Sequence, residues 1–366
     1  MHNNHLSGIL SEVAGSAGNF GTVLPLLFAV SVSSGMDFSL MLIWAAIWYI
    51  ISGLYYRIPV SVEPFKAVGA IAIADHLSPD LIAASGILIG IICFIIGAGR
   101  CMNRLQKLIP EPVIRGVQLG LALILIKSAI AGFIIPDLAF AGMAGGCILV
   151  FYLFRSRFRI PDLSALCIIT AGFLFAFIIA GFPSAGVLPL PHLTIPSGSA
   201  FLTALVLLVP PQLPLTLTNA ILATSLLISD LFNRNEDPDR LSRTVGLMSA
   251  SSSLFGGFPM CHGAGGLAAH YRFGARGGLS MVIGGCLLLF IAGVCTTPDI
   301  MKNLPEGMFG VLLLVVAIEL ASHGIKTKNR FVTAVIALLA IPAGLAVAFG
   351  AGLITAWILM YRKDPS

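Results

Sequence analysis

The chain has 366 residues, of which 57% are hydrophobic and only 10% are charged. Because soluble domains carry about a quarter charged residues, this composition excludes a water-soluble enzyme. The formal net charge of +5 does not indicate a nucleic-acid partner, since the basic residues lie in short loops between apolar runs. These runs predict an all-α polytopic membrane protein whose surroundings are the lipid bilayer.

In chain order, the apolar runs predict about fourteen transmembrane segments. A helix needs about 20 residues to span a bilayer, and several of the expected segments are shorter. The expected segments cover residues 8–33, 38–55, 58–77, 81–99, 112–133, 138–154, 162–181, 200–231, 241–255, 257–271, 278–296, 305–323, 330–346 and 348–361.

The distribution of charge supports an even number of segments. Lys and Arg cluster after the even-numbered segments, whereas Lys302 is the only basic residue in the odd-numbered connections, which otherwise carry aspartates. Basic loops remain in the cytoplasm. The sequence therefore predicts a multi-pass protein of the cell membrane (inner or plasma) with both termini cytoplasmic.

An internal repeat relates the two halves of the chain. Residues 58–74 resemble residues 255–269, and aligning Pro64 with Pro259 gives an offset of 195 residues; the run IPE at 109–111 and the run LPE at 304–306 give the same offset. This offset contains seven expected segments, and an odd number inverts the second copy in the membrane. We therefore expect a 7+7 inverted repeat, with the first copy in residues 1–185 and the second in 196–361.

Two segments, at about 58–77 and 257–271, are interrupted by Pro and Gly at equivalent positions of the repeats. Each is expected to run extended and then to begin a short helix at its proline, Pro64 or Pro259, because proline is tolerated at the first helical position. In an inverted pair the two half-helix N-termini would face each other near the bilayer midplane. Such a pair is the best sequence indication of a transport site.

The expected site suits a small dianion. Each helix N-terminus carries about +0.5 charge, and Lys66 adds another charge, for a total of about +2. Gly263, Gly265 and Gly266 would let backbone N–H groups approach the oxygens of a tetrahedral anion. Cys261 and His262 are expected in the first turn of the second half-helix, as donors or as walls that set the size of the site.

Other readings of these residues stay open. Lys66 can instead extend to the cytoplasmic headgroups or form a neutralising ion pair with Glu63. His262 can be a hydrogen-bonded packing residue, Cys261 a small apolar filler, and the glycines contacts between helices. Lys127 and Glu319, in segments five and twelve, are either structural or part of the gate.

Further polar residues lie in segments one and eight, again seven segments apart. The complete expected substrate-binding set is Lys66, Phe65, Ala67, Cys261, His262, Gly263, Asn19, Gly21, Thr22, Gln212, Thr216 and Asn219. Glu63 and His262 are the candidates for proton coupling, because charge within a span is costly and usually functional. No cofactor or metal site is expected, since no acid lies between His262 and His270 at metal-ligand spacing.

The run FPMCHGAGGL at 258–267, followed by YRFGAR at 271–276, resembles the signature of the molybdate transporter family, relatives of the sulfate permeases. Residues 18–25, 59–74 and 212–224 resemble the family's other characteristic segments. The resemblance implies molybdate uptake and an inverted-repeat fold without a STAS domain. It also implies a core domain from segments 1–4 and 8–11, a gate domain from segments 5–7 and 12–14, and a possible homodimer.

Two positions depart from the family pattern. Asn19 stands where the family has Asp in Gly-Asp-Leu-Gly-Thr, and Glu63 stands where it has Gln before Pro-Met-Lys. One acid is lost and one is gained, which suggests an exchange between neighbouring side chains. We therefore hypothesise that Asn19 and Glu63 lie within hydrogen-bonding reach of each other.

Moving a dianion inward against 100 mV costs about 4.6 kcal/mol, so uptake needs a driving force. The sequence predicts proton-coupled symport of molybdate or a similar oxyanion, in which each proton offsets one negative charge. A transporter of the same fold for sulfate or other oxyanions, or less readily for a nucleobase, is an alternative. A passive anion channel is another. A membrane-embedded enzyme is not expected.

Overall fold

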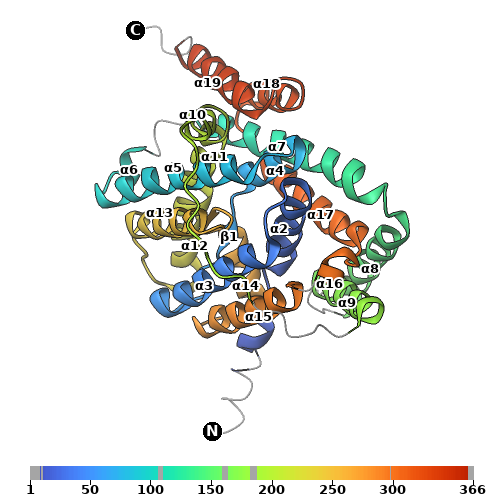
Figure 1. The fold of residues 1–366 in the computed structure, drawn as a ribbon. Helices are drawn as coiled ribbons and strands as arrows, with labels where there is room; N and C mark the ends of the chain where they lie inside the picture. The colour runs from blue at the N-terminus through green and yellow to red at the C-terminus, as the bar shows by residue number, and fades with distance from the viewer. Residues whose placement is uncertain are drawn as a thin grey trace.

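The computed structural model describes residues 9, 11–105, 110–158, 164–181, 188–296 and 298–361, and it is built almost entirely of helices (Figure 1). Among the described residues, six helices are long and apolar enough to cross a membrane: Ser11–Ser34, Phe38–Tyr56, Pro79–Ala98, Glu111–Ile134, Val209–Phe232 and Glu306–Gly324. Shorter apolar helices lie between them. The expectation of a multi-pass helical membrane protein agrees with this architecture.

The first half of the chain forms α2 (Phe20–Ser34), α3 (Phe38–Tyr56), β1 (Glu63–Pro64), α4 (Lys66–Asp75), α5 (Pro79–Ala98), α6 (Met102–Leu105), α7 (Glu111–Ser128), η1 (Ala129–Ile134), α8 (Leu138–Phe158) and α9 (Ser164–Ala180). The second half forms α10 (Gly198–Leu207), α11 (Val209–Leu215), η2 (Thr216–Leu222), α12 (Ala223–Phe232), α13 (Pro238–Leu254), β2 (Met260–Cys261), α14 (Ala264–Arg272), α15 (Leu279–Cys295), α16 (Pro298–Lys302), α17 (Glu306–Gly324), α18 (Arg330–Ala340) and α19 (Leu345–Tyr361). The elements η1 and η2 are π-helical turns.

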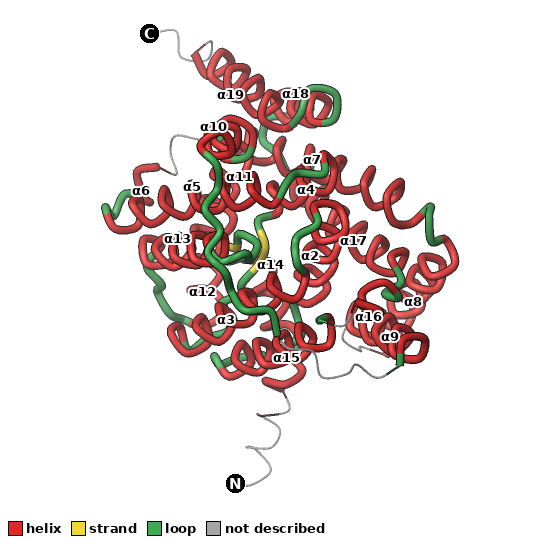
Figure 2. The backbone as a smooth tube through the Cα atoms, viewed as in Figure 1, coloured by secondary structure: helices red, strands yellow, loops and turns green. Residues whose placement is uncertain are grey.

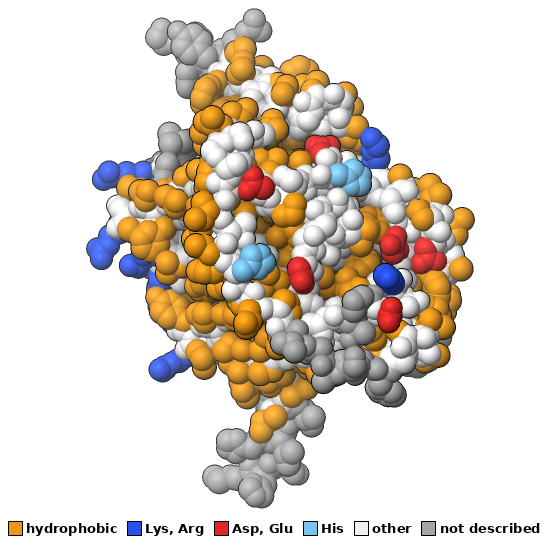
Figure 3. Space-filling model, in the orientation of Figure 1, with side chains coloured by type: hydrophobic (Ala, Val, Ile, Leu, Met, Phe, Trp, Pro, Cys, Tyr) orange, Lys and Arg blue, Asp and Glu red, His pale blue; other side chains and the backbone are white. Residues whose placement is uncertain are grey.

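Hydrophobic side chains cover most of the face drawn in Figure 3, and charged side chains are few and scattered. Large apolar residues such as Leu54, Phe290 and Leu338 are more than half exposed on the outer surface. Contiguous apolar surface of this extent is typical of a protein that contacts lipid.

The two broken segments meet at the centre of the molecule (Figure 2). Strands β1 and β2 pair antiparallel, with Glu63 opposite Cys261 and Pro64 opposite Met260. Helix α4 begins two residues after β1, and α14 begins three residues after β2. Residues far apart in the sequence thus place the starts of two short helices side by side.

This geometry corrects two details of the expected half-helices. Neither helix begins at its proline: Pro64 lies within β1, and Pro259 directly precedes β2, where its carbonyl accepts a hydrogen bond from the Phe65 N–H at 3.0 Å. Cys261 therefore lies in a strand, and His262 in the extended link to α14, instead of in a first helical turn. The cause is the strand pairing, which keeps the backbone extended as far as Gly263, with φ −148°.

The segment expected at 200–231 is divided in the structure. Helix α10 ends at Leu207, and a continuous helical segment from Val209 to Phe232 comprises α11, η2 and α12. Pro210 and Pro211 stand at the start of this second segment, where missing N–H groups are tolerated. The π turn η2 follows directly, and such turns are frequent at functional sites.

Glycines let the long helices pack closely. A Cβ added to Gly90 of α5 would lie 2.8 Å from the Ala250 nitrogen of α13, and one added to Gly285 of α15 would lie 2.8 Å from the Ala46 oxygen of α3. These contacts join elements of the first half of the chain to elements of the second, so the two halves interlock and do not form separate bodies.

Candidate functional site

A small cavity lies where the broken segments meet. Its volume is about 20 Å³, which has room for about one water molecule. Both broken segments, the α11–η2 segment, α7 and α17 contribute to its wall. The lining residues are Glu63, Lys66, Gln118, Gln212, Leu215, Asn219, Ala220, Cys261, His262, Gly263 and Leu320.

Glu63 connects the starts of the two half-helices. Its Oε2 lies 2.9 Å from Lys66 Nζ in an ion pair, and its Oε1 accepts a hydrogen bond from the backbone N–H of Gly266 at 2.7 Å. The residue is only 2% exposed. The ion pair left open by the sequence therefore forms, and the same carboxylate also caps the N-terminus of α14.

Two of the glycines that were expected to admit an anion instead accommodate this carboxylate. A Cβ added to Gly263 would lie 2.2 Å from Glu63 Cδ, and one added to Gly266 would lie 2.4 Å from Glu63 Oε1. Gly265 points elsewhere, with its added Cβ 3.3 Å from Glu319 Oε1 of α17. The glycine-rich sequence thus serves close contact between Glu63 and the backbone of α14.

The N-terminus of α4 is capped by a side chain from another element. Gln212 Oε1 accepts hydrogen bonds from the backbone N–H groups of Ala67 at 2.8 Å and Val68 at 3.3 Å. Its Nε2 donates to Thr216 Oγ1 at 2.9 Å. Because Gln212 is 2% exposed, these contacts fix a buried amide against the first turn of α4.

His262 is held by partners at both ring nitrogens. Its Nδ1 lies 2.9 Å from the Ser61 carbonyl oxygen, which can only accept, so Nδ1 carries a proton. Its Nε2 lies 2.8 Å from Thr244 Oγ1, and that hydroxyl lies 2.6 Å from Tyr56 Oη. Thr244 can donate to a neutral imidazole or accept from a charged one, so the arrangement tolerates both protonation states.

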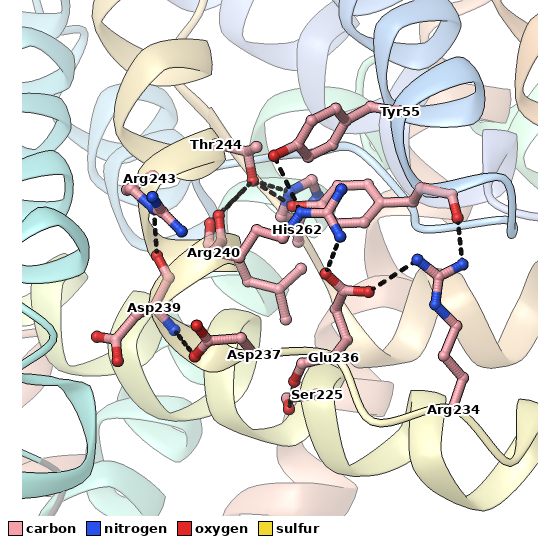
Figure 4. A network of polar contacts seen from close by, with 12 residues as sticks. Tyr55, Ser225, Arg234, Glu236, Asp237, Asp239, Arg240, Arg243, Thr244 and His262 are labelled. Carbon is pink, nitrogen blue, oxygen red and sulfur yellow. Dashed lines mark hydrogen bonds and ion pairs between the residues drawn. The ribbon is translucent and has the colours of Figure 1, made fainter.

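Figure 4 shows that this chain of contacts extends to a charged cluster beside α13. Arg240 lies over the ring of Tyr55, with 4.2 Å between its Cζ and the ring centroid, and pairs with Glu236 at 2.9 Å. Arg234 pairs with the same carboxylate at 3.3 Å and donates to the Tyr56 carbonyl oxygen. The buried Glu236 thus joins the α12–α13 connection to the end of α3.

Asn19 and Glu63 both lie against Gly266, but the hypothesised hydrogen bond between them is not formed. A Cβ added to Gly266 would lie 2.4 Å from Glu63 Oε1 and 2.7 Å from Asn19 Nδ2. Within the described structure, however, Asn19 Nδ2 is buried without a hydrogen-bond partner. The two side chains therefore share one location without bonding directly.

The structure gathers some of the expected site residues at the cavity and places others elsewhere. Glu63, Lys66, Gln212, Asn219, Cys261, His262 and Gly263 line it. Phe65 is fully buried, Ala67 contributes its N–H, and Thr216 contacts Gln212. Gly21 faces Ala165 of α9, and Thr22, also on α2, is not among the lining residues.

Several residues of the site were not anticipated. Gln118 of α7 lines the cavity, and Ser61 and Thr244 hold His262. Gln118 is a polar residue in an apolar run, a signal that sequence reading could have used. Lys127 lines a separate cavity of about 390 Å³ near the ends of α2 and α4, whereas the carboxylate of Glu319 approaches Gly265.

Comparison with known proteins assigns the family. The family described as "Molybdate transporter of MFS superfamily" matches residues 11–125 and 204–320. "Molybdate transporter 2" of Arabidopsis thaliana is 30% identical over 96% of this chain and 88% of its own length. The chain belongs to the molybdate transporter family.

Solved structures support the same fold at greater distance. The transmembrane domain of a cyanobacterial bicarbonate transporter, BicA, matches with TM-score 0.68 and 17% identity, over 94% of this chain and 97% of that one. The murine Solute Carrier 26 family member A9 anion transporter in the inward-facing state matches with TM-score 0.72 and 13% identity, over 97% of this chain and 69% of that one. Family and fold together support transport of an anion across a membrane.

Proposed function

We propose that this protein imports molybdate, held between the N-termini of α4 and α14. One observation carries the proposal: the pairing of β1 with β2 brings both helix starts and the Lys66 ammonium to a single cavity. Helix N-termini favour anions, and a tetrahedral oxyanion offers oxygens to several donors at once. The family and the relative in Arabidopsis indicate molybdate as the substrate.

The arrangement of helices supports fourteen segments in a 7+7 inverted repeat. The expected counterpart of α3 in the second repeat is α13, and that of α15 in the first repeat is α5. Helices α3 and α15 pack together, and their counterparts α13 and α5 pack together as well. In the same way, α8 packs on α17, and their counterparts α18 and α7 also pack together. Symmetry of this kind is expected when the two repeats are related by a pseudo-two-fold axis in the membrane plane.

We further propose that the gate moves against the core. The cavity receives Gln118 from α7 and Leu320 from α17, both in the proposed gate, and its remaining lining residues come from the proposed core. A volume of about 20 Å³ is too small for an anion of five atoms. Separation of α7 and α17 from the broken segments would enlarge the cavity and open it to one side of the membrane.

Glu63 is the proposed proton acceptor. Its carboxylate neutralises Lys66 in the present geometry, so the net positive charge available to a dianion is reduced. A proton on Glu63 would release the ammonium for the anion, which couples arrival of the proton to arrival of the substrate. The inward electrical work on the anion falls by one charge for each proton carried.

Molybdate accumulation in cells that lack their own uptake system tests the proposal. Elemental analysis at nanomolar molybdate, with sulfate in excess, compares the wild-type protein with Lys66→Ala. We expect uptake that survives the sulfate and is lost in Lys66→Ala. Lys302→Ala, which removes an exposed lysine outside the site, should transport like the wild type. Abolition by sulfate would make the substrate sulfate or a broader set of oxyanions.

A further inference from the structure

Gln212 caps α4 in the way that an oxyanion would. Its side-chain oxygen accepts from two consecutive first-turn N–H groups, those of Ala67 and Val68, at 2.8 and 3.3 Å. Such N–H groups at a helix start are the donors that bind phosphate and sulfate oxygens in proteins. Gln212 comes from a different element, 145 residues away from Ala67 in the sequence, so this contact is not a local consequence of the α4 sequence.

The size of the cavity makes the two occupants exclusive. Gln212 lines a space of about 20 Å³ together with Lys66, and a tetrahedral oxyanion is several times larger than the one water that fits there. An anion that reaches the N–H groups of Ala67 and Val68 must therefore take the place of the amide oxygen. The cavity cannot hold the amide oxygen and the anion on the same two N–H groups.

We propose that Gln212 is a self-ligand of the transport site: its amide oxygen holds the position that one oxygen of the substrate oxyanion takes, and the arriving anion displaces it. This inference rests on the proposed function. The exchange is favourable because hydrogen bonds to a charged oxygen are about twice as strong as those to a neutral one. Capping of α4 by Gln212 spares its N–H groups from being buried without partners while the cavity is closed.

Gln212 lies in an irregular part of its helical segment. It lies on α11, which carries Pro210, Pro211 and Pro214 and passes directly into the π turn η2. A π turn is a local irregularity of the helix and is frequent at functional sites. The contact that holds the amide in place is the bond from its Nε2 to Thr216 Oγ1, at the first residue of η2.

Equilibrium binding of molybdate to the purified full-length protein in lipid nanodiscs, measured by calorimetry, tests the proposal. Gln212→Leu keeps the approximate size of the side chain but removes the competing oxygen. We expect it to bind molybdate about two- to tenfold more tightly than the wild type, which corresponds to one ordinary hydrogen bond. Thr216→Val, which releases the amide from its second partner, should shift affinity in the same direction. Gln212→Glu should abolish binding, because a carboxylate would hold both the α4 N-terminus and Lys66.

Weaker binding by Gln212→Leu would overturn the proposal and make Gln212 a direct ligand of the anion. Unchanged affinity would overturn it as well, since the amide would then not be displaced. A second measurement keeps the test valid if the variant is less stable: molybdate should raise the thermal unfolding midpoint of Gln212→Leu by more than that of the wild type. Failure of the wild type to bind molybdate would instead reject the proposed substrate, and sulfate titrated into the same variants would then test the self-ligand separately.

Discussion

Lys66 Nζ lies 2.9 Å from Glu63 Oε2, and the other oxygen of that carboxylate caps α14. One acidic side chain thus neutralises the cation of the first half-helix and occupies the positive end of the second. Addition of the helix dipoles to the lysine charge gave an expected site of about +2, and this carboxylate lowers that total by one. The charge that the site presents to an anion is therefore set by Glu63 together with Lys66 and the two helix starts.

Glu63→Gln should make molybdate uptake insensitive to external pH. In the proposed coupling the proton and the anion are carried together, so uptake by the wild-type protein should rise with the external proton concentration. Glutamine keeps an oxygen for the Gly266 N–H but carries no charge at any pH. Initial rates of uptake between pH 5 and 8 check this; a variant with the wild-type pH profile would assign coupling to another group. His262, already protonated at Nδ1 and bonded at Nε2, is the other candidate.

Gly266→Ala should abolish transport. The added methyl group would lie 2.4 Å from Glu63 Oε1 and 2.7 Å from Asn19 Nδ2, so it would displace the carboxylate from the start of α14. Gly265→Ala is the matched control, because among the described residues outside its own helix its methyl group would approach a side-chain oxygen of Glu319, at 3.3 Å. Uptake by the two variants, at equal amounts in the membrane, distinguishes a specific requirement at 266 from a general intolerance of the glycine run.

Glu236→Gln should destabilise the protein by about 1–3 kcal/mol, because Arg234 and Arg240 would lose their shared buried carboxylate. The side chains of Arg234 and Arg240 are partly exposed, at 39% and 30%. Water can therefore solvate them in the variant, which limits the loss of stability. Thermal unfolding in detergent measures the effect. Glu111→Gln is a suitable comparison, since its carboxylate is 37% exposed and pairs with Arg115 at 3.4 Å. An equal loss of stability in the two variants would contradict the expectation that the buried carboxylate stabilises the protein more than the exposed one.

Gly90→Leu should destabilise the packing of α5 on α13 by about 1–3 kcal/mol or prevent folding, because the interface leaves no room for a side chain. An added Cβ already lies 2.8 Å from Ala250 N and 2.9 Å from Gly246 O, both backbone atoms of α13. Gly146→Leu is the control, because its added Cβ meets no atom of another described element within 4 Å. Size-exclusion profiles and thermal unfolding midpoints report the difference.

Much of the site could be predicted from the sequence. The interrupted apolar runs, the glycine cluster at 263–266, and a lysine and an acid next to Pro64 are local features, and each has a direct physical meaning in a membrane. The repeat offset also predicted that residues 58–77 and 257–271 would act together. The positions of the helix starts were predicted less well, because the strand pairing extends the backbone beyond each proline.

Local sequence patterns do not specify which side chains complete the site. Gln212 caps α4 although it lies 145 residues from Ala67 in the sequence, and Glu63 caps α14 although it lies 203 residues from Gly266. Thr244 of α13 forms a hydrogen bond with His262. Unpaired N–H groups at a buried helix start need acceptors, but the sequence does not specify which ones. The sequence by itself determined that two broken segments would start short helices, one of them beside a lysine. Only the tertiary structure decided that Glu63 and Gln212 satisfy their N–H groups, because that depends on how distant segments pack around a cavity with room for about one water.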